Sequence, residues 1–565
     1  MVSATDLDGR IAYYTMEIGI ENDVKTYSGG LGVLAGDTIR SFADMGLPAV
    51  CVSQLNENGY CKQILEEDGS QISEQDPWPV EEYCEKLDVE VTVPIYGRDV
   101  TVTAWKYDVV SEKSGHTVPI IYLDSNVEAN DPDAREYTKR LYSPGYGEDH
   151  QLAQEIILGI GGTRILDELG YEVDVYHMNE GHAALLTLEL LKRNDMDPEA
   201  VREQCVFTTH TPVEAGHDQF DWGLVNEVLG EFVPQETLKE FSREQDLHMT
   251  LLALNLSRYA NSVAKKHQEV SRNMFPGYDI DAITNGVHVP FWVGDEFMDV
   301  YDEYTTGWQT NPYKLKHASI IPDDDIWAAH QAQKERLIEY VNETEDADMD
   351  PDVLTIGFAR RATAYKRADL IFYNHERLRH IAESVGEFQI IFAGKAFPGD
   401  VDGEGNIRDI YHNAWELNDA VNVEYIEDYD MDVGGLLTQG VDVWLNNPRR
   451  PLEACGTSGM KAAYNGIPQL GTLDGWWVEG HIENETGWKI GPEPDESEPD
   501  ETPAEEEDRT DAMDLYDQLE NTVVPMYYDD REKWIDIMRN TMSFNGPYYH
   551  TRRMAREYLE DAYTN

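Results

Sequence analysis

Short apolar runs alternate with segments of helical periodicity along most of the chain. The segments between the runs, such as 183–192 and 325–340, place apolar residues at helical spacing. This alternation predicts an α/β fold whose parallel sheets are covered by helices on both faces. The runs predicted to be strands are 11–15, 49–53, 173–178, 205–208, 354–359, 389–393, 421–425 and 441–445.

The strand–helix units form two groups, which are separated by a helix-rich connection. We therefore predict two Rossmann-like domains facing a catalytic cleft, with ligands at the carboxyl ends of the strands. The expected limits are 1–290 for the N-terminal domain, 291–529 for the C-terminal domain and 530–565 for a final helical segment. Residues 492–508 are almost entirely acids and prolines, so we expect a solvated insertion rather than a regulatory docking site.

The chain is acidic along its whole length. It has 109 Asp and Glu against 44 Lys and Arg, a formal charge of −65, and 41% of its residues are hydrophobic. The apolar content excludes wholesale disorder, and the negative charge argues against binding nucleic acid through a basic face. So large an excess favours a salt-loving source over an ordinary acidic cytosolic protein. It also makes the D-x-D motif at 428–430 a chance match, so we assign no metal.

Cysteine usage indicates reduced thiols. An odd count without a C-x-x-C pair argues against a disulfide or zinc framework. The N-terminus lacks the basic region and apolar core of a signal peptide, and no apolar run approaches membrane-spanning length. We therefore expect a cytoplasmic protein with no membrane association. The cysteines are Cys51, Cys61, Cys84, Cys205 and Cys455.

The segment 453–466, EACGTSGMKAAYNG, carries the most informative chemistry. It follows a predicted strand and places Lys461 five residues after Gly456. A glycine- and hydroxyl-rich turn between a strand and a helix presents backbone N–H groups to an anion, and a lysine just behind it can pair with a phosphate or form a Schiff base. We interpret the segment as a phosphate pocket with one special lysine. The alternative, a structural glycine turn followed by a surface lysine, has the same spacing.

Three further segments follow predicted strands. Residues 27–37 contain the weak signature G-G-x-G, and residues 179–182 read Asn-Glu-Gly-His. Residues 357–367 place four cations within eight positions, which stands out in so acidic a chain. Arginine suits bidentate phosphate recognition and lysine supplies a point charge, so this cluster predicts an anion site. The alternatives are an unliganded glycine turn, a packing histidine and a merely structural Arg367.

Together these segments resemble the α-glucan (glycogen and maltodextrin) phosphorylases in their compact prokaryotic form. The resemblance also covers 209–212, 284–288 and 394–399. It implies the GT-B architecture, a last helix that crosses back to the N-terminal domain, and pyridoxal 5′-phosphate carried by Lys461. The chain departs from the family pattern at Arg360, where the animal enzymes have lysine, at Cys455, where serine is usual, and at Tyr464, where leucine or methionine is usual.

The resemblance implies a role for each candidate residue. Lys461, Arg361, Lys366 and His182 are the implied catalytic residues. Cofactor contacts are implied for Gly456, Thr457, Ser458, Lys366 and Arg360. Phosphate contacts are implied for Arg361 and for the backbone amides of Gly29, Gly30 and Leu31. Sugar contacts are implied for His182, Asn285, Tyr365, Glu453 and Gly456.

The implied reaction is reversible phosphorolysis of α-1,4-glucan from the non-reducing end to α-D-glucose 1-phosphate, with retention. The cofactor's 5′-phosphate is the implied proton partner of the substrate phosphate, and the cations offset the repulsion between the two. The implied partners are α-glucan or maltodextrin, inorganic phosphate and glucose 1-phosphate; a homodimer is left open. Two rival functions differ in what they need: a nucleotide-sugar glucosyltransferase of the glycogen-synthase kind would not need Lys461, and a non-catalytic glucan-binding protein would have lost charged site residues.

Overall fold

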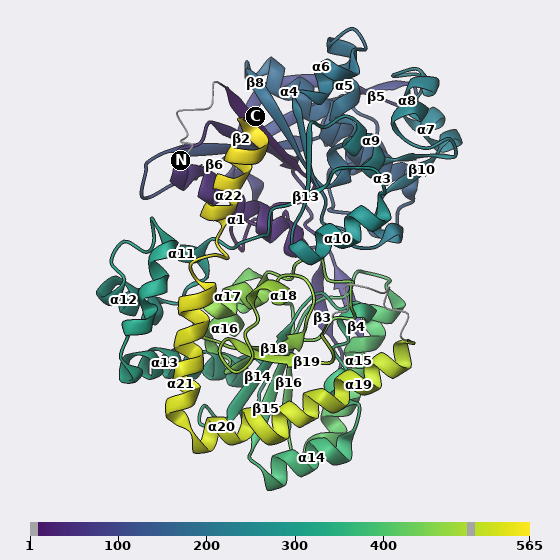
Figure 1. The fold of residues 1–565 in the computed structure, drawn as a ribbon. Helices are drawn as coiled ribbons and strands as arrows, with labels where there is room; N and C mark the ends of the chain where they lie inside the picture. Colours follow the sequence, from purple (N-terminus) through teal and green to yellow (C-terminus); the bar gives the residue numbers. More distant parts are fainter. Residues whose placement is uncertain (1–8, 494–502, 565) are drawn as a thin grey trace. The chain divides into compact units, whose positions relative to one another are not determined.

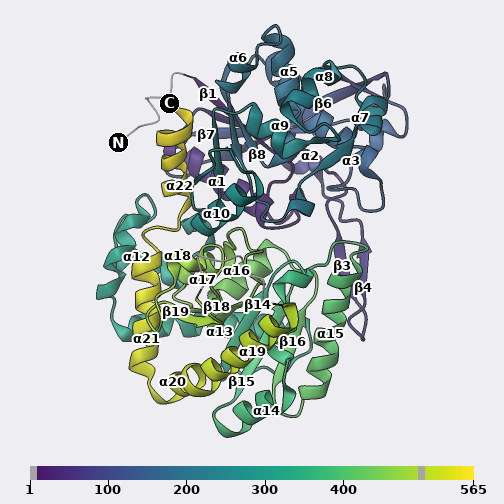
Figure 2. The same cartoon turned by 45° about the vertical axis from the view of Figure 1, so that its right-hand side comes forward.

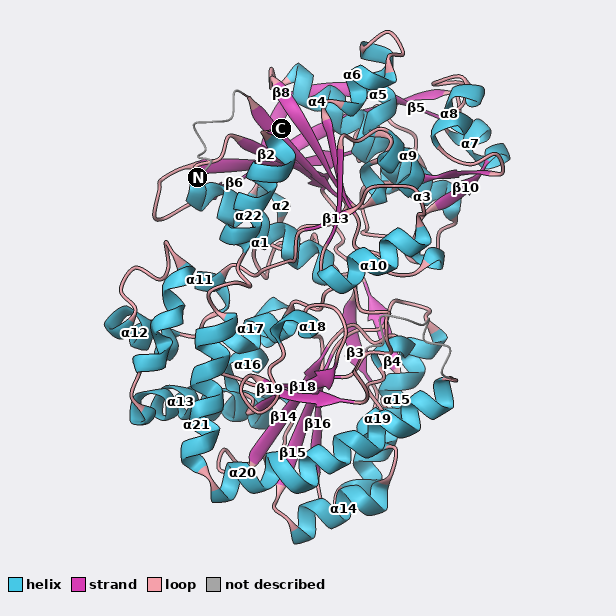
Figure 3. Cartoon of the chain, in the orientation of Figure 1, coloured by secondary structure: helices cyan, strands magenta, loops and turns pink. Residues whose placement is uncertain are grey.

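A computed structural model describes residues 9–493 and 503–564, which form two compact units (Figures 1 and 3). The first unit comprises the chain up to residue 61, residues 75–285 and the chain from residue 551; the second comprises 62–74 and 286–550. Each unit contains a mostly or wholly parallel sheet flanked by helices, which confirms the predicted α/β, GT-B fold class.

The sheet of the first unit has the strand order β13-β12-β9-β8-β1-β2-β7-β6-β5. The seven strands from β13 to β7 pair in parallel, and β6 and β5 extend the sheet antiparallel at one edge. The order along the chain reverses between β1 and β8, which makes this the topological switch point where such sheets bind ligands. The strands are β1 (Arg10–Thr15), β2 (Ala49–Gln54), β5 (Glu85–Ile95), β6 (Arg98–Val110), β7 (Thr117–Asp124), β8 (Val173–Asn179), β9 (Cys205–Thr208), β12 (Tyr259–Ser262) and β13 (Asp281–Ala282).

Residues from both ends of the chain build the core of the first unit. Met554 and Tyr558 are buried in one apolar cluster with residues of β1, β2 and α1, and the hydroxyl of Tyr563 lies 2.6 Å from Nδ1 of His177. The helices are α1 (Gly30–Met45), α2 (Val80–Tyr83), α3 (Glu148–Ile156), α4 (Gly162–Glu168), α5 (Leu186–Arg193), α6 (Pro198–Arg202), α7 (Trp222–Val228), α8 (Gln235–Phe241), α9 (Met249–Asn255), α10 (Lys265–Met274) and α22 (Thr551–Glu557), with a short ribbon of β10 (Gln219–Asp221) and β11 (Asp246–His248).

The sheet of the second unit is wholly parallel, in the order β16-β15-β14-β17-β18-β19. Numbered along the chain this is 3-2-1-4-5-6, the order of a doubly wound dinucleotide-binding sheet, so its switch point lies between β14 and β17. The strands are β14 (Leu354–Ala359), β15 (Phe388–Ala393), β16 (Asn422–Ile426), β17 (Val443–Asn446), β18 (Gln469–Thr472) and β19 (Gly487–Ile490).

A hairpin from early in the chain completes the second unit, where it lies beside α15 (Figure 2). Gly69 sits at the hairpin turn with φ +78°, and a Cβ there would come within 2.7 Å of the Tyr411 ring, so both conformation and space require glycine. The hairpin strands are β3 (Lys62–Leu65) and β4 (Gln71–Glu74), and the helices of the unit are α11 (Val289–Trp292), α12 (Asp295–Tyr304), α13 (Asp323–Thr344), α14 (His375–Ser384), α15 (Val401–Leu417), α16 (Met431–Gly440), α17 (Ser458–Tyr464), α18 (Trp477–Gly480), α19 (Ala504–Gln518), α20 (Val524–Asp529) and α21 (Arg531–Asn540).

The expectation of a solvated loop over 492–508 is wrong at its C-terminal end. Residues 494–502 lie outside the described part of the chain, but α19 begins at Ala504 and buries Glu507. Acids in the first turn of a helix interact favourably with its dipole, and Glu507 also pairs with Arg449 at 2.9 Å. The composition of the segment indicates neither this helix nor the ion pair between Glu507 and Arg449.

Two acidic sites have structural roles. Asp430 of the D-x-D motif accepts hydrogen bonds from the backbone of Asp432 and Val433 at the start of α16, whereas Asp428 pairs with Lys395 at 2.6 Å.

None of the described helices is long and apolar enough to cross a membrane. The five cysteines are buried, and none of them forms a disulfide in the described part of the chain.

A buried ion pair lies at the amino ends of β14 and β17. Nζ of Lys334 lies 2.6 Å from Asp442, whose other oxygen is 2.7 Å from Nε2 of His330, and the backbone N–H of Thr355 also donates to Asp442. Burial opposes the charge of Asp442, but Lys334 and His330 outweigh it and lower the pKa of this carboxyl. This pair is therefore a stability element at the end of the sheet away from the switch point.

Candidate active site

At the switch point of the second unit, the segments that follow β14 and β17 lie side by side. The backbone N–H of Arg449 donates to the carbonyl of Tyr365 at 2.8 Å, and the amide of Asn447 donates to the carbonyl of Arg367 at 2.8 Å. These bonds join the predicted cation cluster at 360–367 to the segment that leads into Glu453. Open α/β sheets bind ligands at this place, so the topology itself marks it as a site.

Glu453 forms ion pairs with two of the predicted cations. Its Oε2 accepts a hydrogen bond from the Arg360 guanidinium and another from Nζ of Lys366 at 2.7 Å. All three side chains are buried, and the Lys366 ammonium also lies 4.4 Å from the centre of the Tyr365 ring. Arg361, directly after Arg360, is exposed. A carboxylate, Glu453, therefore pairs with two of the four cations of the predicted cluster.

Burial and neighbouring charges set the ionisation of this cluster. Burial raises the pKa of Glu453, but Arg360 and Lys366 outweigh it and lower this pKa to about 2. Burial, with the repulsion of Arg360, lowers the pKa of Lys366 to about 7, although Glu453 opposes that shift. At neutral pH Glu453 is therefore ionised while Lys366 is near its titration point. Nη1 of Arg360 is buried and has no hydrogen-bond partner among the described groups, so it is available to an anionic ligand.

The turn after Glu453 leads into the helix that carries Lys461. Gly456 has φ +79°, which favours glycine, and Thr457 and Ser458 follow at the start of α17; Oγ of Ser458 accepts from the Trp444 indole at 3.2 Å. Lys461 is 7% exposed, and its ammonium lies 3.4 Å from the centre of the Trp292 ring. The predicted special lysine is thus a buried residue with an aromatic contact, so the surface-lysine alternative is wrong.

Asp474 belongs to this site but was missed in the sequence. It follows β18, and its carboxylate accepts from the backbone N–H of Glu453 at 2.8 Å and of Gly475 at 2.9 Å. Burial, together with the charge of Glu453, raises the pKa of Asp474 to about 7. The available signal was a short T-L-D-G turn after a strand, which carries little weight among 109 acids.

In the first unit, Glu17 holds the glycine turn that follows β1. Its Oε2 accepts from the backbone N–H groups of Ser28 at 2.6 Å and Gly29 at 3.1 Å, and its Oε1 accepts from the Tyr142 hydroxyl at 2.9 Å. The Gly29 amide, a predicted phosphate donor, therefore already has a partner. Gly30 and Leu31 begin α1, and a Cβ at Gly30 would meet nothing within 4 Å. The space at Gly30 is open to a ligand.

His182 lies after β8, across the switch point of the same sheet. Its ring is 5.9 Å from that of Tyr142, and its Nε2 is 3.4 Å from Asp218. Tyr142 therefore links the glycine turn to His182. Nδ1 of His182 is buried without a hydrogen-bond partner in the described part of the chain.

Glu180 shapes the turn that carries His182. It adopts φ +78°, and its carboxylate accepts from the backbone N–H groups of Gly181 at 3.0 Å and His210 at 2.6 Å. Burial opposes ionisation, but the nearby histidines, led by His217, lower the pKa of Glu180. This glutamate was visible in the sequence as the neighbour of His182, but its role was not predicted.

Asn285, where the chain passes from the first unit to the second, is buried with an unused acceptor. Its backbone N–H donates to Val263 at 3.0 Å and its carbonyl accepts from Arg553 at 3.0 Å. Its Oδ1 has no partner among the described residues. Because a buried acceptor without a partner is costly, this oxygen is suited to a ligand hydroxyl.

Comparison with known proteins finds relatives of this chain. A family model described as carbohydrate phosphorylase matches residues 175–561. A maltodextrin phosphorylase from Thermococcus litoralis is 38% identical over 98% of this chain and 70% of its own length. Glycogen phosphorylases from Aquifex aeolicus and Mycobacterium tuberculosis are 36% and 33% identical, covering 98% and 100% of this chain and 86% and 71% of their own lengths.

Proposed function

The chain belongs to the carbohydrate phosphorylase family, and we propose that residues at the switch point of each sheet take part in the phosphorolysis of α-1,4-glucans. It is an α-glucan phosphorylase, a glycosyltransferase that uses inorganic phosphate to release glucose 1-phosphate. The observation that carries the site assignment is the buried Arg360–Lys366–Glu453 cluster at a switch point. A nucleotide-sugar glucosyltransferase is not favoured by the family match.

The second unit offers residues that fit pyridoxal 5′-phosphate. Lys461 is buried in contact with Trp292, and Arg360 has a buried donor without a partner in the described structure. We propose that Lys461 holds the cofactor's carbonyl carbon and that Arg360, Lys366 and the turn at 456–458 hold its phosphate. When bound, the cofactor supplies a second phosphate that exchanges a proton with the substrate phosphate.

The chain's own residues position the substrates. In our proposal Lys366 and Arg361 offset the repulsion between adjacent phosphates, and they do so most strongly where water is excluded. Glu453 favours the charged form of Lys366 and also offers an acceptor for a sugar hydroxyl. Asn285 and His182 provide further polar contacts for the glucosyl unit.

Replacing Arg361 by alanine should weaken the use of phosphate far more than the use of glucan. Its exposed planar guanidinium suits bidentate contact with phosphate. Initial rates measured against phosphate at saturating maltodextrin should show a raised KM for phosphate, whereas the exposed Arg408→Ala on α15 should behave as wild type. An unchanged phosphate KM in Arg361→Ala would place the anion site elsewhere.

We also infer adaptation to high salt. At a formal charge of −65 the chain repels itself and its anionic substrates, and salt shortens this repulsion from about 10 Å at 0.1 M to about 3 Å at 1 M. The thermal midpoint and the activity should both rise from dilute buffer towards about 1 M salt. A thermal midpoint and an activity that are the same in dilute buffer as in about 1 M salt would refute the salt adaptation and leave the phosphorylase assignment intact.

A further inference from the structure

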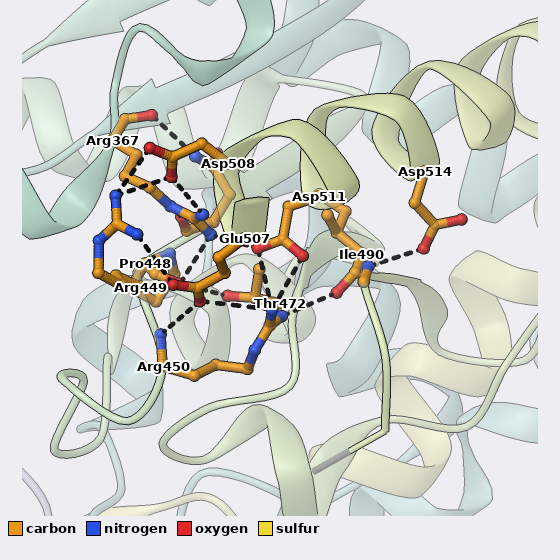
Figure 4. Close-up of polar contacts among 12 residues, drawn as sticks. Arg367, Pro448, Arg449, Arg450, Thr472, Ile490, Glu507, Asp508, Asp511 and Asp514 are labelled. Carbon is orange, nitrogen blue, oxygen red and sulfur yellow. Dashed lines mark hydrogen bonds and ion pairs between the residues drawn. The ribbon is translucent and has the colours of Figure 1, made fainter. Parts of the chain in front are cut away.

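Three arginines from the two site-bearing segments converge on helix α19 (Figure 4). Arg367 comes directly after Lys366, and Arg449 and Arg450 precede Glu453 by four and three positions. Their partners are three acids of α19, so the cluster has as many carboxylates as guanidinium groups. These acids are Glu507, Asp508 and Asp511.

Asp511 is the member that bridges the two segments. One carboxylate oxygen accepts from Nη2 of Arg367 at 2.7 Å and lies 3.1 Å from Nη2 of Arg450, and the other accepts from Arg450 at 2.9 Å. Asp511 is fully buried, and the side chains of Arg367 and Arg450 are 4% and 8% exposed. In such a site the attraction is little screened by water or salt.

The remaining contacts support this bridge. Asp508 accepts from Arg367 at 3.0 Å, and its two carboxylate oxygens accept from Nη2 of Arg449 at 2.7 and 2.8 Å. Nε of Arg367 also donates to the carbonyl of Asn447 at 2.9 Å. Arg367 is therefore held at once by α19 and by the neighbouring segment, and it follows Lys366 directly in the chain.

Removing the negative charge of Asp511 leaves the two buried arginines without the carboxylate that bridges them. A guanidinium group does not release its proton in a protein, so Arg367 and Arg450 stay charged and repel each other. The repulsion is then relieved by water entry or by movement of the segments that carry Lys366 and Glu453. Displacement of about 1 Å in a reacting site can cost on the order of 100-fold in rate.

We propose that Asp511 is a positioning residue of the active site, which sets the placement of Lys366 against Glu453 by bridging Arg367 and Arg450. The inference rests on the proposed roles of Lys366 and Glu453. It gives helix α19, which follows the acidic segment directly, a part in the reaction through Arg367 and Arg450.

The test is Asp511→Asn, which keeps the size of the side chain and removes its charge. We expect kcat/KM for phosphate to fall about 10- to 100-fold. The alkaline limb of the pH profile should also move to lower pH, because a looser contact with Glu453 stabilises the charged form of Lys366 less. Arg367→Lys, which keeps the charge but loses the planar fork, should show the same two changes and provides the test if Asp511→Asn does not fold.

Two matched variants separate positioning from stability. Asp514→Asn makes the same change one turn further along α19, where the carboxylate accepts from the backbone N–H of Gly491 at 2.7 Å, and its kinetics should equal wild type. Asp442→Asn breaks the buried pair with Lys334 at the far end of the same sheet. It should lower the thermal midpoint and leave the phosphate KM and the pH profile of the folded enzyme unchanged.

The outcomes distinguish this role from the proposed function. An Asp511→Asn enzyme that loses stability as Asp442→Asn does, but keeps the wild-type phosphate kinetics and pH profile, would overturn the positioning role alone. A wild-type chain that releases no glucose 1-phosphate in the same assay would overturn the proposed function and the role of Asp511 with it. A fall in kcat/KM confined to Asp511→Asn and Arg367→Lys would support the positioning role.

Discussion

Lys461→Ala should have no measurable phosphorolytic activity and yet remain folded. The lysine is buried on α17, where its ammonium lies 3.4 Å from the centre of the Trp292 ring. Alanine removes the amine that we propose to hold pyridoxal 5′-phosphate, and a neighbouring lysine cannot replace it because Lys366 is already paired with Glu453. Alanine is a strong helix former, so α17 itself should persist.

Borohydride reduction followed by peptide mass mapping tests this prediction directly. The wild-type protein should carry a pyridoxyl mass on the peptide that contains Lys461, and Lys461→Ala should carry none. Lys489→Ala is a matched control, because this lysine lies in the same unit but pairs with the exposed Glu493 at 2.8 Å. Full activity in Lys461→Ala, or a label on another lysine, would refute the cofactor assignment.

Glu453→Gln should reduce phosphorolysis at least about 100-fold, the second largest effect that we expect. The glutamine leaves Arg360 and Lys366 buried beside each other without the carboxylate that joins them. Removing one partner of a buried charged cluster strongly destabilises the arrangement that remains. The sugar contact proposed for Glu453 is weakened by the same change.

The pH profile of Glu453→Gln should shift in a defined direction. The pKa of Lys366 is lowered to about 7 by burial and by Arg360, and Glu453 opposes this shift. In wild type the charged lysine is lost as the pH rises through this pKa, so activity should fall on the alkaline side. Without Glu453 the same limb should move to lower pH.

A second carboxylate of the same unit provides the control. Burial and the nearby Glu345 raise the pKa of Glu424, on β16, to about 7, and this side chain has no part in the proposed site. Glu424→Gln should therefore keep the wild-type pH profile. Rates in Glu453→Gln that match those of Glu424→Gln at every pH would show that the Arg360–Lys366–Glu453 cluster is not catalytic.

Periodicity predicted much of the fold because burial dictates it. Strands buried on both faces read as continuous apolar runs, and the runs at 354–359 and 389–393 match or overlap β14 and β15. The antiparallel strands β5 and β6 were missed. Their solvated faces interrupt the apolar pattern with residues such as Glu90 and Asp99, so no continuous run marks them.

The sequence indicates the site residues that belong to a local motif, and it does not indicate those that act through contacts between separate segments. Lys461 and the cation cluster are local patterns in the chain, and motif resemblance identified them. Asp474, Glu17 and Asp511 act through contacts between segments distant in sequence: Glu17 lies 11 residues from Ser28, and Asp511 lies 144 residues from Arg367. In a chain with 109 acids, only the folded structure distinguishes these carboxylates from solvated ones.

This chain breaks down glucan by transferring a glucosyl unit to inorganic phosphate, and not to water. The most direct measurement is ³¹P and ¹H NMR of the purified protein with maltodextrin and inorganic phosphate, beside a sample with water in place of phosphate. We predict a growing α-glucose 1-phosphate signal in the first sample and no release of glucose in the second. No glucose 1-phosphate from maltodextrin and phosphate, together with glucan extension from a nucleotide sugar, would contradict the claim.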